Sequence, residues 1–257
     1  MFHSARMDHL LEIDEGAWVR LVLNRPAARN ALNTALLGDL AASLQRHADR
    51  PACRAVLIQG AEGHFAAGAD IAEIETRTTA DAATDPRKAH WAAVRAFPKP
   101  LVAAIEGFAL GGGLELALMA DLMVVGDTAR LGLPETGLGL IPGAGGGQRL
   151  LSRIGPARAA RMVLTGEIID ADTAHAWGIA SHRAADAVAE GAALTARLAE
   201  RAPLASRAAK AALVVGAETA LAFAEERAGF EALLSSADKQ EGIRAFRERR
   251  KPDFRGR

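Results

Sequence analysis

Short apolar segments alternate with helical patterns along the first half of the chain. Residues 10–23 predict a hairpin, because apolar and β-branched residues flank a turn of two acids and a glycine. Short apolar runs predict further strands at 55–59, 101–105 and 122–125. These runs have no polar alternation, which is typical of strands buried on both faces of a sheet.

Helical periodicity appears between the predicted strands. A helix is expected to begin at Asn33-Thr34, because four leucines then fall on one face, at positions 36, 37, 40 and 44. A shorter helix is expected from about Leu114 to Ala120, directly after three consecutive glycines. Strands that alternate with helices favour an α/β fold with largely parallel strands and helical cover.

The second half of the chain is predicted to be mainly helical. Successive helices are expected at residues 148–154, 156–164, 172–177, 186–202, 203–215 and 217–235. We therefore expect an α/β core over residues 1–195, followed by a helical C-terminal region over residues 196–257.

Composition and charge narrow the class of protein. The chain has 257 residues, of which 50% are hydrophobic, and this suits one large globular domain. Its 31 basic and 31 acidic residues balance, so no overall field favours nucleic acid or an anionic membrane. The N-terminus lacks the apolar core of a signal peptide, and the apolar region 101–125 contains three acids. A cytoplasmic protein without membrane spans is expected.

Cys53 is the single cysteine of the chain. One cysteine excludes a disulfide within the chain and argues against a thiolate metal site. Its neighbours at 55–58 are apolar, so we expect a small buried hydrophobic residue and no metal centre.

Two glutamates stand alone in apolar segments. Glu115 is the only ionisable residue between Glu106 and Asp121, and Glu135 is the only one between Arg130 and Arg149. Burial of an unpartnered carboxylate is costly and raises its pKa towards the range where it can exchange protons near neutral pH. The two acids indicate proton transfer at two places on one substrate. The alternatives are a structural buried acid at Glu115 and a loop cap at Glu135.

Two segments rich in small residues are candidates for binding an oxyanion. Residues 65–70 read Phe-Ala-Ala-Gly-Ala-Asp, and residues 109–115 read Ala-Leu-Gly-Gly-Gly-Leu-Glu. Glycines at the start of a helix leave unpaired N–H groups, to which the helix dipole adds positive potential. One N–H from each segment suits a thioester carbonyl that becomes an enolate. The alternative for either segment alone is a tight turn, and neither matches the P-loop or dinucleotide-binding pattern.

Five stretches, taken in order, resemble one family. They are residues 23–32 (LNRPAARNAL), 65–71 (FAAGADI), 109–117 (ALGGGLELA), 133–135 (LPE) and 140–150 (LIPGAGGGQRL). Through them the chain resembles the enoyl-CoA hydratase/isomerase (crotonase) superfamily over nearly its full length. The resemblance implies a crotonase-like (ββα)n spiral core with a C-terminal helical region that forms trimers.

The resemblance also implies roles for individual residues. The N–H groups of Ala69 and Gly112 would form the oxyanion hole, and Glu115 and Glu135 would match the two catalytic glutamates of the hydratase branch. These residues would add water reversibly, in a syn sense, to a 2-enoyl-CoA and give a 3-hydroxyacyl-CoA, as in fatty-acid β-oxidation. No metal or redox cofactor is implied, because coenzyme A is part of the substrate.

Further substrate-lining residues are implied in the same way. They are Ala28, Ala67, Gly68, Asp70, Ile71, Gly111, Pro134, Gly143, Phe246 and Arg249. Asp70 has an alternative role as the cap of a helix that begins at Ile71. Phe246 and Arg249 belong to a C-terminal helix that in the family reaches the CoA of a neighbouring subunit, and a solvated basic tail is the alternative. A homotrimer or a homohexamer is expected by the same resemblance.

Three other functions stay open at the level of sequence. One is movement of a double bond between C3 and C2 of an enoyl-CoA, which needs only one base. Another is a different acyl-CoA lyase reaction, because pocket walls rather than motifs set the substrate. The third is a non-catalytic crotonase-like protein that binds RNA or another partner, for which Arg153, Arg158 and Arg161 are the candidate basic face. Such a role would leave the paired glutamates without a purpose, so no nucleic-acid partner is expected.

Overall fold

The computed structural model describes residues 4–6, 9–75, 80–81, 84–214 and 236–257. Its largest element is a seven-stranded sheet in the order β1-β2-β3-β4-β5-β7-β10. The strands are β1 (Ser4–Arg6), β2 (Leu10–Asp14), β3 (Trp18–Leu23), β4 (Ala55–Gly60), β5 (Leu101–Ile105), β7 (Leu122–Val125) and β10 (His182–Arg183). The first three pair antiparallel, and β3 through β10 pair parallel. The predicted hairpin, the three later strands and the largely parallel pairing are all confirmed.

A second, three-stranded sheet lies beside the helix that carries Glu115. It contains β6 (Phe108–Leu110), β8 (Arg130–Gly132) and β9 (Ile168–Asp170), with β6 and β8 parallel and β8 and β9 antiparallel. This sheet is not predicted from the sequence, because a three-residue strand is too short to show periodicity. β6 leads directly into α4 (Gly112–Ala117), so the small sheet fixes where that helix begins.

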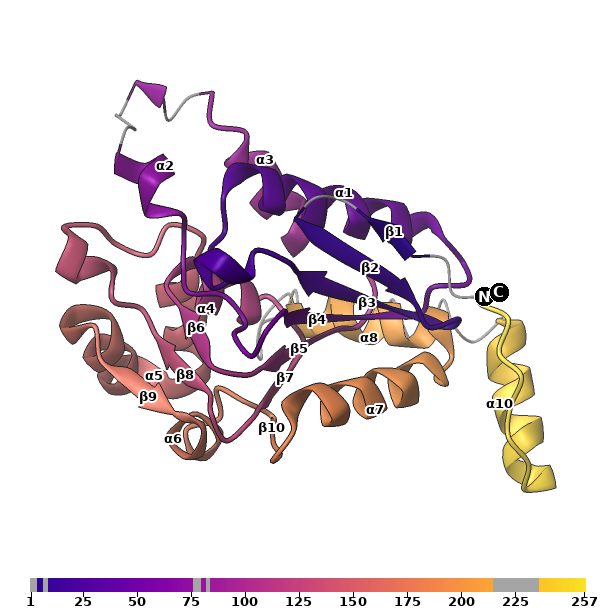
Figure 1. Cartoon of the computed structure of the whole chain (residues 1–257). Helices are drawn as coiled ribbons and strands as arrows, with labels where there is room; N and C mark the ends of the chain where they lie inside the picture. The colour runs from indigo at the N-terminus through magenta and orange to yellow at the C-terminus, as the bar shows by residue number, and fades with distance from the viewer. Residues whose placement is uncertain (1–3, 7–8, 76–79, 82–83, 215–235) are drawn as a thin grey trace.

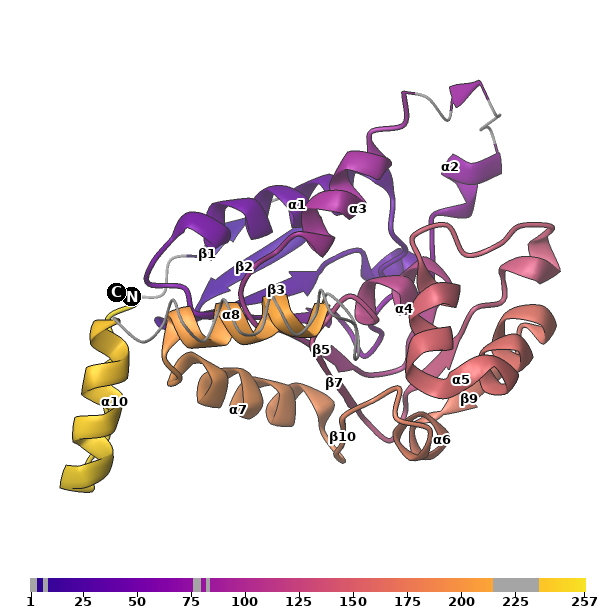
Figure 2. The same cartoon turned by 180° about the vertical axis from the view of Figure 1, so that it is seen from behind.

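Helices cover the main sheet on both faces, with α1 (Thr34–Asp49) and α3 (Arg87–Arg95) on one side and α7 (Ala187–Ala199) and α8 (Pro203–Val214) on the other (Figures 1 and 2). Alternate residues of β4 supply the two cores. Val56 and Ile58 belong to the core that includes α1, and Leu57 belongs to the core that includes α7. α1 begins where the sequence predicted, after Asn33. The Asn33 side chain caps the helix by accepting a hydrogen bond from Leu36 N at 2.8 Å.

The remaining helices agree in part with those predicted from the sequence. They are α2 (Ile71–Glu75), α5 (Gly146–Thr165), α6 (Ala171–Ala176) and α10 (Ala237–Glu248), with 3-10 turns η1 (Pro26–Ala28) and η3 (Glu135–Leu138). The two helices predicted on either side of Gly155 are one element, broken there by a non-helical glycine that precedes Pro156. α4 begins two residues before its predicted start, and α3 was not predicted. The helix predicted at 217–235 lies outside the described residues.

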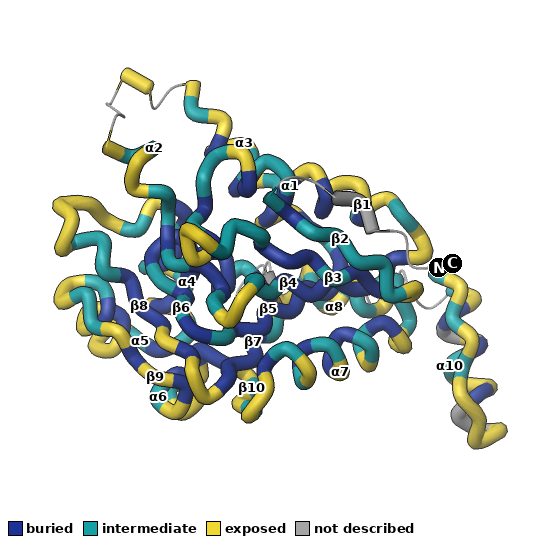
Figure 3. The backbone as a smooth tube through the Cα atoms, in the orientation of Figure 1, coloured by how far each residue is buried: buried dark blue, intermediate teal, exposed yellow. Residues whose placement is uncertain are grey.

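The burial pattern separates the sheet from the C-terminal helix. The central strands are buried along their length, whereas α10 extends from the body with most of its surface exposed (Figure 3). The predicted boundary after residue 195 falls inside α7, which packs on β4 and β5, and the division into two regions stays a prediction. In the described part of the chain, no helix is long and apolar enough to cross a bilayer.

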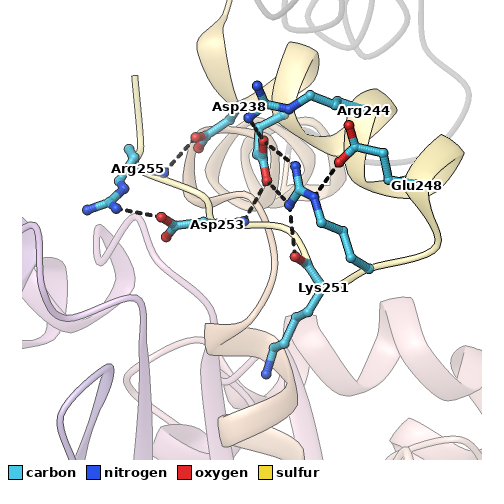
Figure 4. A network of polar contacts seen from close by, with 8 residues as sticks. Asp238, Arg244, Glu248, Lys251, Asp253 and Arg255 are labelled. Carbon is cyan, nitrogen blue, oxygen red and sulfur yellow. Dashed lines mark hydrogen bonds and ion pairs between the residues drawn. The ribbon is translucent and has the colours of Figure 1, made fainter.

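The last residues fold back along α10 through a network of ionic contacts (Figure 4). The carboxylate of Asp238 accepts hydrogen bonds from Arg255 N at 2.7 Å and Gly256 N at 2.8 Å. The guanidinium of Arg54, next to β4, donates to the carbonyl oxygen of Phe254 at 2.6 Å. These contacts fix the tail against α10 and connect it to the start of β4 in the main sheet.

Candidate active site

A pocket of about 360 Å³ lies among α2, α3, α4, η3 and the loop before α5. These elements gather on the side of the molecule opposite α10 (Figure 1). Ala69, Gly112, Glu115 and Glu135 all line this one pocket. The structure therefore brings together the four residues to which sequence analysis assigned chemistry. The volume of the pocket is within the usual range for small-molecule sites.

One isolated bridge places the two small-residue segments side by side, and a second holds the first segment against Leu32. Leu32 bridges to Ala69 and Ala66 bridges to Ala109, both in parallel orientation. The residues next to Ala69 are fixed, because Leu32 N donates to Gly68 O at 2.8 Å and Asp70 N donates to Leu32 O at 3.2 Å. The segment that carries Ala69 is thereby held against the start of α4.

The N–H groups of Ala69 and Gly112 form a pair of donors. Gly112 is the first residue of α4, so its N–H has no partner within the helix. Neither N–H donates to any acceptor in the described part of the chain. A Cβ on Gly112 would lie 3.6 Å from Ala69 N, which shows how closely the two segments approach. Two unpaired donors this close together are suited to one oxygen atom that gains negative charge.

The neighbouring glycines are required by close packing and by backbone conformation. A Cβ on Gly113 would lie 2.2 Å from Ala66 O, so only glycine allows the two segments to meet. Gly111 has a φ of 49° and Gly68 a φ of 124°, both in the region that favours glycine. The alternative of simple tight turns is therefore incomplete, because these glycines also bring the two donors together.

Glu115 lies on α4 and is held by backbone donors. Its side chain is buried, with 4% of the residue exposed, and Oε1 accepts hydrogen bonds from Ala144 N at 2.7 Å and Gly146 N at 2.9 Å. No described cation forms an ion pair with it, and Oε2 has no hydrogen-bond partner among the described residues. The carboxylate is thus fixed through one oxygen while the other is left for a ligand.

Glu135 opens η3 and is less constrained. Its Oε2 is buried and has no hydrogen-bond partner within the described residues. Burial raises the pKa of the Glu135 carboxyl above its usual range, and the negative charge of Glu115 raises it further. A Cβ on Gly111 would lie 3.2 Å from Glu135 Oε1, so this carboxyl lies against the glycine that precedes the oxyanion pair. A raised pKa suits a group that gives and takes a proton near neutral pH.

Most of the other predicted substrate-lining residues reach the pocket. The structure places Ala67, Gly68, Ile71, Gly111, Pro134 and Gly143 in its wall. Ala28 is exposed in η1, outside the pocket lining. Asp70 is also outside the lining, where it pairs with Arg25 at 2.9 Å and accepts a hydrogen bond from Ala72 N. That contact agrees with the alternative in which Asp70 caps a helix that begins at Ile71.

The two C-terminal residues are remote from the pocket within this chain. Arg249 is exposed just after α10, with a φ of 52°. Phe246 belongs to α10, and its side chain lies outside the described part of the structure. The expected contact of either residue with a neighbouring subunit's ligand stays a prediction.

The candidate basic face for RNA is not formed as predicted. The guanidinium of Arg153 donates to the carbonyl oxygens of Leu118 and Ala120, at 3.0 and 3.1 Å. Arg158 stacks over the ring of Trp177. Arg161 pairs with Glu167 and contacts the same ring. Arg153 is thus bonded within the fold, and the charge of Arg161 is neutralised by Glu167.

Several pocket residues were missed by sequence analysis. They are Ile74, Asp85, Arg87, Lys88, Trp91, Leu138, Leu140, Ile141 and Ala144. Trp91 is buried on α3, a helix that is not predicted because its exposed face is rich in alanine and basic residues. The part of the wall from Leu138 to Ile141 overlaps residues 140–150, one of the stretches that resemble the family. The only other sign that this part binds a ligand is that its apolar residues are exposed in a loop.

No described group of three or more histidine, cysteine, aspartate or glutamate side chains is arranged to hold a metal ion. The single cysteine is buried beside β4, and burial raises the pKa of the Cys53 thiol to about 11. Such a thiol is not poised for nucleophilic chemistry. The prediction that Cys53 is a small buried hydrophobic residue is confirmed.

Comparison with known proteins agrees with this geometry. The family model for enoyl-CoA hydratase/isomerase matches residues 15–257. A 2,3-dehydroadipyl-CoA hydratase of Escherichia coli K12 is 46% identical over 241 residues, which cover 92% of this chain and 94% of the relative. A crystal structure of an enoyl-CoA hydratase subunit from Geobacillus kaustophilus matches with a TM-score of 0.93 at 36% identity, over 98% of this chain and 100% of that one.

A second solved structure gives the same result. The enoyl-CoA hydratase of Mycobacterium tuberculosis matches with a TM-score of 0.89 at 32% identity, over 98% of this chain and 100% of that one. The expected crotonase-like α/β fold is confirmed by these matches, as is the expectation of an enzyme of this superfamily. The chain belongs to the enoyl-CoA hydratase/isomerase family.

Proposed function

We propose that the chain catalyses the reversible syn addition of water to the double bond of a 2-enoyl-CoA, which gives a 3-hydroxyacyl-CoA. The observation that carries this proposal is that one pocket contains two unpaired backbone donors and two carboxylates without a described cation. The donors can hold the thioester oxygen, and the acids can transfer protons at the adjacent carbons.

The proposed reaction uses these groups together. The thioester carbonyl oxygen binds between Ala69 N–H and Gly112 N–H, which polarises the conjugated system and makes C3 electrophilic. Glu115 removes a proton from a water that lies between the two acids, and this water adds to C3. The enolate oxygen stays between the two donors while Glu135 delivers a proton to C2. The chemistry needs no metal or redox cofactor, and we propose none.

Two features favour hydration over the other functions. Movement of a double bond between C3 and C2 needs one base, whereas this pocket contains two acids, one of them with a raised pKa. Relatives named as hydratases support the same choice, including one named for 2,3-dehydroadipyl-CoA. A homotrimer or a pair of trimers is part of the proposal, by resemblance to the family.

A direct assay tests the proposal. The purified chain is mixed with crotonyl-CoA, and hydration is followed as loss of the absorbance of the conjugated thioester. A 3-enoyl-CoA is the parallel substrate, because an isomerase would instead create that absorbance. Rapid loss with crotonyl-CoA is expected. Isomerisation without hydration, or tight and salt-dependent RNA binding without any acyl-CoA turnover, would overturn the proposal.

A further inference from the structure

A second cavity, of about 170 Å³, lies where the core, α8 and the C-terminal tail meet, and we call it the basic cavity. It shares no lining residue with the active-site pocket. Its charged lining residues are Arg54, Lys99, Arg207 and Arg255, together with the acid Asp49. The four cations come from the loops before β4 and β5, from α8 and from the tail. Like charges that gather in one cavity repel one another unless an anion lies among them.

Lys99 is the buried cation of the basic cavity. Only 6% of the residue is exposed, and its ammonium donates to His47 O at 2.6 Å and Arg50 O at 2.8 Å. These carbonyl oxygens give Lys99 a structural role at the end of α1, but an ammonium has a third N–H donor. Burial lowers the pKa of Lys99, and the positive charge of Arg207 lowers it further. The repulsion between the two cations is not relieved by the carbonyl oxygens.

Arg54 and Arg207 also have no acidic partner among the described residues. The guanidinium of Arg54 donates to Phe254 O at 2.6 Å and, over a longer distance of 3.4 Å, to Ala199 O. Arg207 is exposed on α8, and its side chain forms no hydrogen bond or ion pair within the part of the chain that the structure describes. A guanidinium has five N–H donors in a planar fork, so both arginines have donors left for an anion.

The other two charged residues do not neutralise the basic cavity. Arg255 is exposed and already pairs with Asp253, which is outside the cavity lining. Asp49 is exposed at the end of α1, and its negative charge acts on Lys99. One exposed carboxylate does not balance the remaining cations, so the cavity has an excess of positive charge.

We propose that the basic cavity binds a small oxyanion of the phosphate class. Such an ion presents several oxygen atoms at once, so it can accept charge-assisted hydrogen bonds from Lys99, Arg54 and Arg207 together. A volume of about 170 Å³ is below the usual range for organic ligands, which fits an inorganic ion rather than a nucleotide. The bound ion joins the core to α8 and stabilises the packing of the C-terminal region. The site is independent of the proposed hydration.

Thermal unfolding in the presence of inorganic phosphate tests the site. Phosphate replaces chloride at constant ionic strength, so that the screening of exposed charges does not change. The wild-type Tm should rise by about 3–5 °C for each tenfold increase in phosphate above its Kd, as expected for an ion that binds only the folded chain. A wild-type Tm that does not respond to phosphate would overturn the proposal.

Arg207→Met should raise the Kd for phosphate about 10-fold and so remove most of this rise in Tm. In chloride alone the same variant should be at least as stable as wild type, because its loss relieves the repulsion of Lys99. Phosphate should therefore reverse the order of the two proteins. Arg201→Met is the matched control, because Arg201 is an exposed cation outside the basic cavity, and it should keep the wild-type response. An equal response in Arg207→Met and wild type would indicate a general salt effect and overturn the proposal.

Coenzyme A carries the same phosphate chemistry, and a parallel titration separates it from the free ion. CoA should raise the Tm of wild type and Arg207→Met equally, because its own phosphates bind elsewhere. A CoA response that depends on Arg207 would assign the basic cavity to a phosphate of CoA and overturn the proposal of a free ion. Neither titration measures turnover of an enoyl-CoA, so failure of the proposed function would leave both results unchanged.

Discussion

Glu135 in the pocket and Glu241 on α10 are both glutamates, but they differ in the groups that contact their carboxylates. Glu241 accepts hydrogen bonds from Arg250 Nη1 at 2.6 Å and Asp253 N at 2.9 Å, and it also pairs with Arg244. These partners hold the pKa of Glu241 well below its usual range. Glu135 has no such cation among the described residues, one of its oxygens has no partner there, and burial raises its pKa.

The comparison separates a stabilising acid from a reactive one. The C-terminal network gives its carboxylates cations and N–H donors, and these contacts hold the tail on α10 (Figure 4). The pocket leaves Glu135 incompletely partnered, which costs stability and keeps its proton available. Glu115 lies between these extremes, because one oxygen is fixed by two N–H groups while the other is left for a ligand.

The largest expected effect is on the two pocket acids. Glu115→Gln and Glu135→Gln should each lower kcat for crotonyl-CoA hydration by about 10²- to 10⁴-fold, because each removes one proton-transfer group. Circular dichroism should show an unchanged fold. Glu241→Gln, the matched acid of the C-terminal network, should keep the wild-type rate. Unchanged turnover in either pocket variant would remove that residue from the mechanism.

A methyl group beside Glu115 should have the next largest effect. A Cβ on Gly146 would lie 2.8 Å from Glu115 Cγ, so Gly146→Ala must displace the carboxylate, and kcat should fall by about 10- to 100-fold. Gly147→Ala is the matched control, because the atom nearest to its Cβ is Val163 Cγ2 at 3.9 Å. Steady-state kinetics of the two variants make the comparison. Equal rates for both would show that the position of Glu115 does not limit the reaction.

A smaller effect is expected at Arg149, which holds the turn that donates to Glu115. Its Nη1 donates to Ala144 O at 2.8 Å, and Ala144 N in turn donates to Glu115. Arg149→Met should lower kcat about 10-fold with little change in KM, and Arg149→Lys should recover part of the rate, as for a positioning residue. The pH profile of kcat should shift in the methionine variant. A change confined to KM would assign Arg149 to substrate binding instead.

The smallest expected effect is on stability as a function of pH. The Glu241 carboxylate, with its lowered pKa, stabilises the fold above its unfolded value of 4.5, and this contribution is lost as pH falls through the folded-state pKa. Glu135, with its raised pKa, destabilises the fold as pH rises through 4.5 and then through the folded-state value.

Thermal unfolding between pH 3 and pH 8 checks both signs. At pH 7, Glu135→Gln should raise Tm by about 1–3 °C and Glu241→Gln should lower it by a similar amount. Both differences should shrink towards pH 3, where Glu135 is protonated in both states and Glu241 is mostly protonated in the unfolded state. A lower Tm for Glu135→Gln at pH 7 would contradict the view that the pocket destabilises this acid.

Sequence patterns predicted the elements whose apolar residues form a clear local pattern. α1 was predicted because its leucines fall on one face, the hairpin because apolar and β-branched residues flank a turn, and the buried strands because their apolar runs are continuous. Glu115 and Glu135 were found because a single acid in an apolar segment is conspicuous. The oxyanion pair was found because glycines at a helix start imply unpaired donors, together with the family resemblance.

Other features depend on contacts between distant residues and leave little local signal. The small sheet of β6, β8 and β9 forms from strands of three residues that come together only in the fold. Ala144 N is a donor to Glu115 because of the turn before α5, and nothing in the side chain of an alanine predicts this. Arg87 and Lys88 are ordinary basic residues in sequence, and only the fold places them in the pocket wall.

A crystal structure of the chain with butyryl-CoA, a saturated thioester that cannot be hydrated, tests the proposed chemistry most directly. The thioester oxygen should lie about 2.7–3.1 Å from both Ala69 N and Gly112 N. A water molecule should contact the carboxylates of both Glu115 and Glu135, close to C3 of the acyl chain. A thioester oxygen bound away from these two N–H groups, or an acyl chain that leaves either glutamate out of reach, would contradict the proposed mechanism.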